Sequence, residues 1–387
     1  MELETDETVP MRALLAGARQ NLGDLLDLTC RLTQAESPSD NKAAVDACVT
    51  LAADDARAMG GRVRLVRQRQ WGNLLVARFG PRGKRAVEDR VLLLGHLDTV
   101  WPVGTLKTMT LRQAGGRLYG PGVFDMKAGA AIAMTALKML TEANLLKREV
   151  VLLLTSDEEV GSPVSRPTIE ELAQSSTAVY VLEPALGPAV KTARKGTGDW
   201  RIDIHGVAAH AGVDFEKGSS AVRELARVIE TVSGWTDLKR GLTTSVGLVG
   251  GGAKSNVIPA EAWAEVDVRI ARRADGTRIE RKFAALKAAD RRCSVKVSGG
   301  INRPPMERTR SNAKLYRQAR LLAAEMGLEL PEASTGGASD GNFTSALGIA
   351  TLDGMGAVGE GAHAVHESVI INQLPLRTAL LAGLLAR

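Results

Sequence analysis

Three apolar runs of this sequence lead directly into histidine or acidic residues. The junctions are Val91–Leu94 before Gly95-His96-Leu97-Asp98, Val150–Leu154 before Thr155-Ser156-Asp157-Glu158-Glu159, and Ala178–Leu182 before Glu183. Asp125 stands apart from them, in the glycine-rich segment YGPGVFDMK. Continuous apolar runs are typical of strands covered on both faces, and ligands of open α/β sheets collect at the carboxyl ends of such strands. The sequence therefore predicts one polar site built from these side chains.

Carboxylates gathered at one site require positive charge nearby. Neighbouring carboxylates raise one another's pKa, and each pKa unit corresponds to about 1.4 kcal/mol of free energy. A divalent metal ion removes this cost, and mixed histidine and carboxylate ligands suit zinc, manganese or cobalt. His96 and Asp98 are two residues apart, so on an extended strand Asp98 can accept a hydrogen bond from the ring nitrogen of His96 that does not bind metal. Taken alone, the pair could also be a strand-end histidine beside a turn aspartate.

The hydrophobic pattern predicts an α/β fold in which a second domain interrupts the first. Helices are expected at 11–35, 42–59 and 125–140, and strands at 61–67, 73–78, 91–94, 150–154 and 178–182. From residue 194 the pattern alternates, and strands and helices follow in the order β-α-β-β-α-β of a ferredoxin-like unit. The predicted domains are therefore 1–193 and 305–387 together, with 194–304 inserted between hinges near residues 194 and 304.

Composition narrows the class of protein. A chain of 387 residues exceeds one ordinary core, which agrees with two domains. Aromatic residues make up only 3% and the basic residues are scattered among acidic ones, so a net charge of +6 indicates a solvated surface and not nucleic-acid binding; the alternative is a basic pocket for an anionic small molecule. The three cysteines form no CxxC pair, and we see neither a signal peptide nor an apolar run long enough to span a membrane. We therefore expect a cytoplasmic protein.

Nine segments stand in the order found in the M20 family of metallopeptidases, which the sequence resembles over nearly its whole length. They are GHLDTVWPVG, YGPGVFDMKAG, TSDEEVGS, LEP, GVAAHAG, SNVIP, VDVR, TGGASDG and GAHAVHE. The segments ARKGTG and HGVAAHAGVDFEKGSSAV are most similar to glutamate carboxypeptidases of the carboxypeptidase G2 type. The resemblance implies a zinc-exopeptidase-type α/β catalytic domain with an inserted ferredoxin-like lid and dimerisation domain. One departure is DMKAG, where many members have a second glycine.

The resemblance also implies two divalent metal ions per chain, most simply zinc. Asp125 would bridge the two ions. His96 and Glu183 would complete one metal site, and Glu159 and His363 the other. The chemistry agrees, because two metals about 3.5–4 Å apart can share a carboxylate and a water whose pKa falls to about 7.

The neighbouring acid Glu158 would be the general base, with Asp98 supporting the catalytic site. A free carboxylate beside the metals can take a proton from water and pass it to the leaving nitrogen. Adjacent Glu158 and Glu159 suit a division between base and ligand, although such a pair is more often a solvated acidic turn. We expect His366 to lie on the surface and Glu367 only to close the loop.

The resemblance assigns four residues outside the metal centre to the substrate. His210 would come from the partner subunit of a homodimer and polarise the scissile carbonyl. Asn256 and Arg269 would contact substrate, and Arg269 suits a bidentate grip on a carboxylate. Gly337, in TGGASDG, would offer backbone N–H groups to a carboxylate. His210 and Arg269 could also be surface residues, and TGGASDG could be merely a tight loop before a helix.

These assignments lead us to expect a dinuclear-metal hydrolase that cuts an amide bond next to a free carboxylate. A carboxypeptidase that releases C-terminal glutamate or a similar amino acid is the first expectation, with a small molecule or peptide as substrate. The alternatives are an N-acyl amino acid deacylase that uses the same metals and a catalytically dead binding protein. The complete set of metal and base residues argues against the dead protein.

Overall fold

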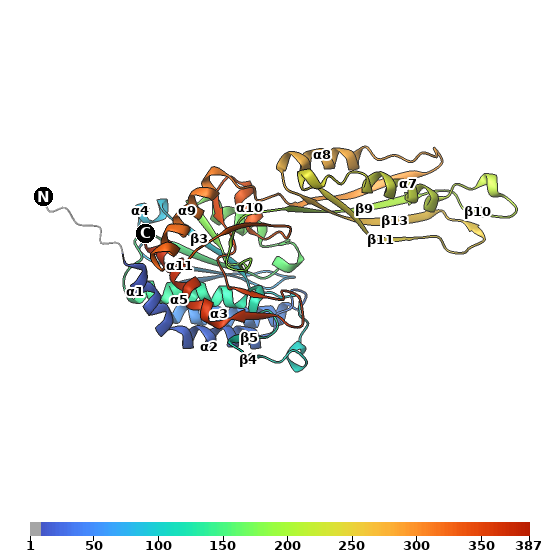
Figure 1. Cartoon of the computed structure of the whole chain (residues 1–387). Helices are drawn as coiled ribbons and strands as arrows, with labels where there is room; N and C mark the ends of the chain where they lie inside the picture. Colours follow the sequence, from blue (N-terminus) through green and yellow to red (C-terminus); the bar gives the residue numbers. More distant parts are fainter. Residues whose placement is uncertain (1–8) are drawn as a thin grey trace. The chain divides into compact units, whose positions relative to one another are not determined.

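A computed structural model describes residues 9–387, which form two compact units (Figure 1). Unit 1 consists of the chain up to Ala193 together with Arg308–Ser334 and Ser339–Arg387. Unit 2 consists of Arg194–Glu307 and Thr335–Ala338. Within the described range, no helix is long and apolar enough to cross a membrane.

Unit 1 is built on a six-stranded mixed sheet in the order β1-β2-β6-β3-β7-β16. The strands are β1 (Arg62–Val66), β2 (Leu74–Phe79), β3 (Val91–His96), β6 (Val150–Thr155), β7 (Ala178–Val181) and β16 (Ala350–Leu352). β3 runs parallel to both β6 and β7, and β7 parallel to β16, whereas β1 and β2 are antiparallel to their neighbours. Every residue of β3, β6 and β7 is buried, as the continuous apolar runs predict.

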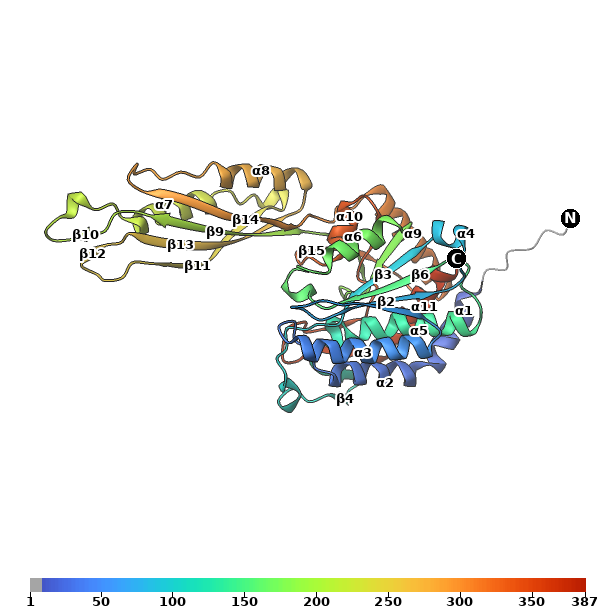
Figure 2. The same cartoon turned by 180° about the vertical axis from the view of Figure 1, so that it is seen from behind.

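Helices cover both faces of this sheet (Figures 1 and 2). They are α1 (Met11–Gln20), α2 (Leu22–Gln34), α3 (Lys42–Ala58), α4 (Lys84–Glu88), α5 (Ala128–Glu142), α6 (Arg166–Gln174), α9 (Arg310–Glu325), α10 (Gly341–Ala346) and α11 (Leu374–Ala386). Because side chains alternate along a strand, Leu93 and Leu152 join the core with α1, α2, α3, α5 and α11. Leu92 and Val151 face the opposite core, which includes α6 and Phe343 of α10.

Two helix predictions in unit 1 need correction. The single helix expected at 11–35 is two helices, because the chain turns at Asn21, whose side-chain amide donates to the Gly17 carbonyl. The helix expected from Asp125 begins only at Ala128, because the backbone of Asp125 and Met126 is not helical.

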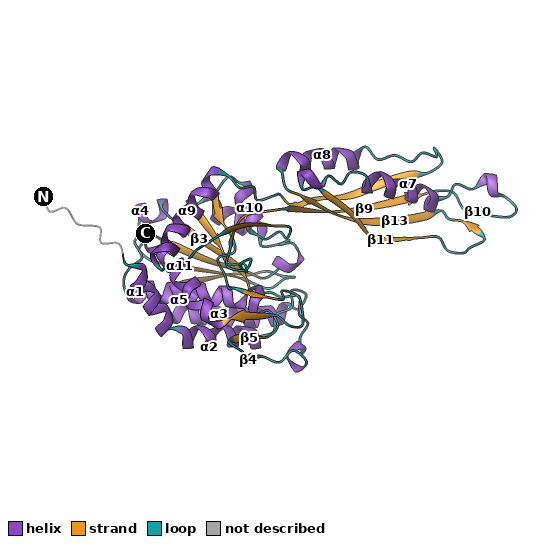
Figure 3. Cartoon of the chain, in the orientation of Figure 1, coloured by secondary structure: helices purple, strands orange, loops and turns teal. Residues whose placement is uncertain are grey.

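Unit 2 is a four-stranded antiparallel sheet with two helices on one face (Figure 3). Its elements are β9 (Gly196–His205), α7 (Ala221–Ser233), β11 (Thr243–Gly251), β13 (Glu261–Ile270), α8 (Arg273–Ala284) and β14 (Ser294–Arg303). The sheet order β11-β13-β9-β14 is that of a ferredoxin-like fold. Trp200 of β9 stacks on Phe283 of α8 at a ring distance of 4.3 Å, within the core of this unit. The predicted fold class, an α/β domain with an inserted α+β domain, is confirmed.

The chain passes from unit 1 to unit 2 between Ala193 and Arg194 and returns between Glu307 and Arg308, slightly after the expected residue 304. The segment Thr335–Ala338 also belongs to unit 2, which the sequence did not indicate. It is held there by the Arg194 guanidinium, which donates to the carbonyls of Gly337 and Ala338 at 3.2 Å.

Candidate metal centre

Three neighbouring parallel strands of unit 1 deliver acidic and histidine side chains to one edge of the sheet. His96 is the last residue of β3 and pairs with Thr155 of β6, and Glu158 and Glu159 follow three and four residues later in a 3₁₀ turn, Glu158–Val160. On the other side, Leu94 of β3 pairs with Val181 of β7, two residues before Glu183. The parallel register therefore brings all three junctions to the same place, as expected for an open α/β sheet.

Asp125 lies between two histidines, with one carboxylate oxygen toward each. Its Oδ1 is 3.2 Å from His96 Nε2, and its Oδ2 is 3.4 Å from His363 Nε2. His96 Nε2 is also 3.6 Å from Glu183 Oε1, and His363 Nε2 is 3.2 Å from Glu159 Oε2. The structure thus brings together all five residues predicted as metal ligands, in two groups that share Asp125.

The donor set of this centre fits divalent cations. The ligand atoms of His96, Asp125 and Glu159 all lie within 4.8 Å of one another, and so do those of His96, Glu158 and Glu183. Glu159 Oε1 is buried and has no hydrogen-bond partner among residues 9–387. Because a buried carboxylate oxygen without a donor is costly, a metal ion is the partner that its chemistry calls for.

Without a cation, protons must balance the charge of this cluster. Burial alone would lower the pKa of His96, but the carboxylates of Asp125, Asp98 and Glu183 outweigh it and raise that pKa well above its ordinary value. Hydrogen bonds to Asp125 and Glu159 raise the pKa of His363 to about 10. Since a metal binds the neutral imidazole, loading the centre displaces these protons.

Asp98 supports the centre mainly through backbone groups. Its carboxylate is fully buried and accepts hydrogen bonds from Ser39 Oγ at 2.7 Å and from the backbone N–H groups of Glu158 and Glu159 at 3.2 and 3.1 Å. The predicted contact with the His96 ring is long, at 3.5 Å, and the backbone carbonyl of Asp98 lies closer to His96 Nδ1, at 3.0 Å. Asp98 therefore ties the end of β3 to the turn that carries the two glutamates.

Glu367 does far more than close a loop, so the expectation for this residue is wrong. Its fully buried carboxylate accepts hydrogen bonds from the backbone N–H groups of Gly122, Phe124 and Asp125 at 2.9, 2.9 and 3.0 Å, and from Trp101 Nε1 at 2.9 Å. It fixes the turn that presents Asp125 and explains why that turn is not helical. No local pattern signalled this role, because Glu367 precedes β18 (Ser368–Ile370), whereas Glu158, Glu159 and Glu183 follow apolar runs. His366 is exposed, as expected.

Lys127 is a second supporting residue that the sequence analysis missed. Its ammonium is buried, donates to Ser37 Oγ at 2.5 Å and to the Leu97 carbonyl at 2.7 Å, and lies 3.0 Å from Cys48 Sγ. Leu97 separates His96 from Asp98, so Lys127 joins the segment after Asp125 to the end of β3.

The predicted substrate-contacting residues lie in unit 2, at two opposite ends of its sheet. His210 is exposed on β10 (Ala209–His210), where Ala211 N–H donates to the Asn256 carbonyl at 3.0 Å. Arg269 lies near the far end of β13, where Asp267 holds its Nη2 at 2.7 Å, and Gly337 lies at that same end.

The length of β13 separates the two pairs. From Glu261, beside the His210 end, to Arg269 the strand rises about 26 Å. One copy of unit 2 therefore brings His210 to Asn256 but not to Arg269.

Comparisons with known proteins agree with this architecture. The model of the Peptidase family M20/M25/M40 matches residues 92–387. Carboxypeptidase G2 from Pseudomonas sp. (strain RS-16) is 30% identical over 327 residues, covering 81% of this chain and 76% of that protein. Succinyl-diaminopimelate desuccinylase from Xanthomonas oryzae pv. oryzae (strain PXO99A) is 28% identical and covers 95% and 99%. The crystal structure of aminopeptidase PepT from Bacillus cereus ATCC 10987 superposes with a TM-score of 0.78 at 20% identity, covering 95% and 98%.

The position of Asp125 between the two histidines predicts that both ions depend on it. In Asp125→Asn, one carboxylate oxygen becomes an amide group that cannot bind a cation, so we expect one ion or none per chain. Elemental analysis after dialysis measures this, with Asp54→Asn, an exposed acid of α3, as the matched control. Two ions retained in the Asp125 variant would contradict the bridging role.

The contacts of Glu367 predict a large effect on metal affinity from a residue that touches no metal. Glu367→Gln leaves one carbonyl oxygen for four donors, and each buried donor left unpaired costs about 1–3 kcal/mol. We expect the metal affinity to fall about 10- to 100-fold, together with a lower unfolding midpoint. Competition with a chelating dye measures the affinity. Glu360→Gln, an exposed acid of the same segment paired with Arg117, is the control, and equal affinities of the two variants would refute this role.

Proposed function

The chain belongs to peptidase family M20/M25/M40, and from this premise we propose that it uses two zinc ions to hydrolyse an amide bond next to a free carboxylate. As an M20 metallohydrolase it has a dinuclear metal site. The observation that carries the proposal is Asp125, whose two oxygens each face one histidine. Two histidines with three carboxylates are a set that zinc accepts, with manganese or cobalt as alternatives.

We assign the general base to Glu158. When bound, the two ions polarise the scissile carbonyl and lower the pKa of the attacking water to about 7. Glu158 would take a proton of that water as the water oxygen bonds to the carbonyl carbon, and it would deliver the proton to the leaving nitrogen as the C–N bond breaks. Two features support this role: Glu158 is buried beside His96 and Glu183, and Asp98 holds its backbone N–H.

For the substrate, we propose a peptide or small molecule from which C-terminal glutamate or a similar amino acid is released. The similarity to carboxypeptidase G2 supports this choice. Arg269 would grip the free carboxylate of the substrate, in an orientation set by Asp267, and Gly337 would add a backbone N–H. The second candidate, an N-acyl amino acid deacylase, is favoured by the similarity to succinyl-diaminopimelate desuccinylase over almost the full length of both chains.

We further propose a homodimer in which residues 194–304 act as lid and dimerisation domain and residues 1–193 and 305–387 as catalytic domain. β11 is an edge strand of unit 2, and its Leu248 and Val249 are each 57% exposed, which leaves a strand edge and apolar side chains for a second copy. Since one copy keeps His210 and Asn256 far from Arg269, we assign His210 to the partner's active site. There it would stabilise the developing oxyanion by about 3–4 kcal/mol.

We propose a cytoplasmic location for this enzyme. Cys30, Cys48 and Cys293 are all free thiols, which suits a reducing compartment. Fractionation of the native cells with an antibody tests this proposal, and recovery of the protein outside the cytoplasmic fraction would contradict it.

The role of Glu158 predicts a separation of metal binding from turnover. Glu158→Gln removes the base but no predicted ligand, so we expect two ions per chain and a kcat reduced about 10²- to 10⁴-fold. Glu171→Gln, an exposed acid of α6, is the control. The assay uses two sets of substrates, namely peptides that end in glutamate and N-succinyl amino acids. The set that the wild type hydrolyses discriminates the two substrate classes. A kcat within twofold of the wild type would exclude Glu158 as the base.

The assignment of His210 to the partner predicts that two inactive variants restore activity when mixed. In a heterodimer of His210→Ala and Glu158→Gln chains, one site receives both an intact base and an intact histidine. Equal mixing should therefore recover about a quarter of the wild-type activity, because half of the dimers are mixed and each holds one complete site. No recovery after subunit exchange, verified by mass spectrometry, would contradict the trans role.

A further inference from the structure

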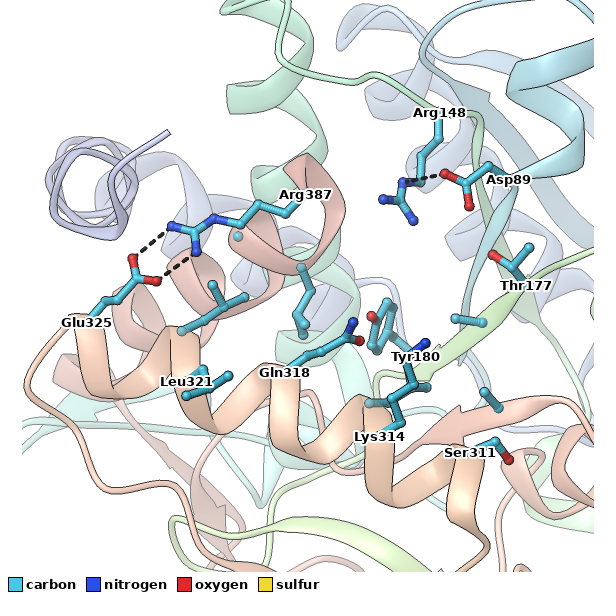
Figure 4. Close-up of a pocket in the computed structure, with 16 residues that line it drawn as sticks. Asp89, Arg148, Thr177, Tyr180, Ser311, Lys314, Gln318, Leu321, Glu325 and Arg387 are labelled. Carbon is cyan, nitrogen blue, oxygen red and sulfur yellow. Dashed lines mark hydrogen bonds and ion pairs between the residues drawn. The ribbon is translucent and has the colours of Figure 1, made fainter. Parts of the chain in front are cut away.

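A pocket of ≈ 780 Å³ lies in unit 1 at the edge of the sheet opposite to the metal centre (Figure 4). It opens where the strands begin: Ala178 of β7 and Ala350 of β16 line it, together with Asp89 and Arg148, which lie two residues before β3 and β6. Its volume is typical of small-molecule sites. From Ala178 to Glu183 the chain rises about 16 Å, so this pocket and the metal centre are separate sites at the two ends of β7.

One face of α9 forms the long wall of the pocket. Its lining side chains follow a helical spacing of three and four residues and are Ser311, Lys314, Gln318, Leu321 and Glu325. Leu321 is 65% exposed. A helix face packed against a core would be apolar, whereas four of these five side chains are polar and one, Leu321, is apolar. The wall therefore offers both kinds of contact to a ligand.

Tyr180 of β7 places a hydroxyl in the pocket without a partner. The residue is only 3% exposed, and its hydroxyl makes no hydrogen bond within the part of the chain that the structure describes. Burial raises the pKa of Tyr180 to about 12, so the group is a hydrogen-bond donor at neutral pH. The hydroxyl faces the pocket, where a ligand oxygen can accept a hydrogen bond from it.

The charges of the lining leave one positive group uncompensated. Arg387 is paired with Glu325 through two hydrogen bonds of 2.7 and 2.8 Å, and Arg148 lies 3.4 Å from Asp89. Lys314 is exposed on α9, lines the pocket and has no ion pair to any residue in the described range 9–387. The pocket thus presents one unmatched ammonium and one unpaired donor, which complements a single negative charge.

We propose that this pocket binds a small amphiphilic carboxylate. Its carboxylate lies at Lys314 and Tyr180, and its aliphatic or aromatic part lies on the apolar lining of Leu315, Leu322 and Leu384. This site is independent of the proposed hydrolysis, because none of its residues belongs to the metal centre.

The test is calorimetric titration of the metal-loaded, full-length protein with octanoate as probe. We expect saturable binding, weakened about 3- to 10-fold in both Lys314→Gln and Tyr180→Phe, since each loses one hydrogen bond to the carboxylate. Arg317→Gln removes an exposed charge from the same helix outside the pocket and should bind as the wild type does. Octanamide should bind more weakly than octanoate, and octylamine more weakly still.

Three results would overturn the proposal. One is the absence of octanoate binding at millimolar concentrations. The second is equal affinity of the wild type and both pocket variants, which would mean that octanoate binds elsewhere, including the metal centre. The third is octylamine binding as tightly as octanoate.

Tyr180→Phe keeps the buried ring, so an unchanged unfolding midpoint and unchanged turnover identify a correctly folded variant.

Discussion

Charge balance at the carboxyl ends of three buried parallel strands is the constraint on which the rest of the structure depends. The apolar interiors of β3, β6 and β7 set a fixed register, and that register forces His96, Glu159 and Glu183 into one small volume together with Asp125. Such a cluster cannot persist as free carboxylates, because burial and mutual repulsion both oppose ionisation. The negative charge of the cluster is balanced either by protons on the two imidazoles or by metal ions. The arrangement around Asp125 suits two metal ions.

The surrounding chain is organised to keep this cluster in place. Asp98, Lys127 and Glu367 are all buried, and each binds backbone groups of a segment distant in sequence from its own. Asp98 joins the ends of β3 and β6, Lys127 joins the Asp125 segment to β3, and Glu367 joins the Asp125 turn to the segment of His363. His96 ends β3, whereas Asp125 and Glu159 lie in turns whose backbone N–H groups are held by Glu367 and Asp98.

Much of the centre could be predicted from the sequence because its signal is local. An apolar run that leads into a histidine or an acid identifies both the strand and the polar edge of the sheet, and this pattern singled out His96, Glu158 and Glu183. Glu367 was missed because its hydrogen-bond partners lie more than 240 residues away, in a turn whose backbone shape no local pattern encodes. The break at Asn21 and the late start of α5 at Ala128 were missed for a related reason, since side-chain hydrogen bonds outweigh helix propensity there. The separation of His210 from Arg269 emerged only from the register of β13.

The central claim is that Asp125 is shared by two metal ions, and a crystal structure of the zinc-loaded protein with anomalous scattering data at the zinc edge tests it most directly. The account predicts two anomalous peaks about 3.5–4 Å apart, one beside each oxygen of Asp125, with His96 and His363 on different ions. A single peak, or a second peak that does not contact Asp125, would contradict it.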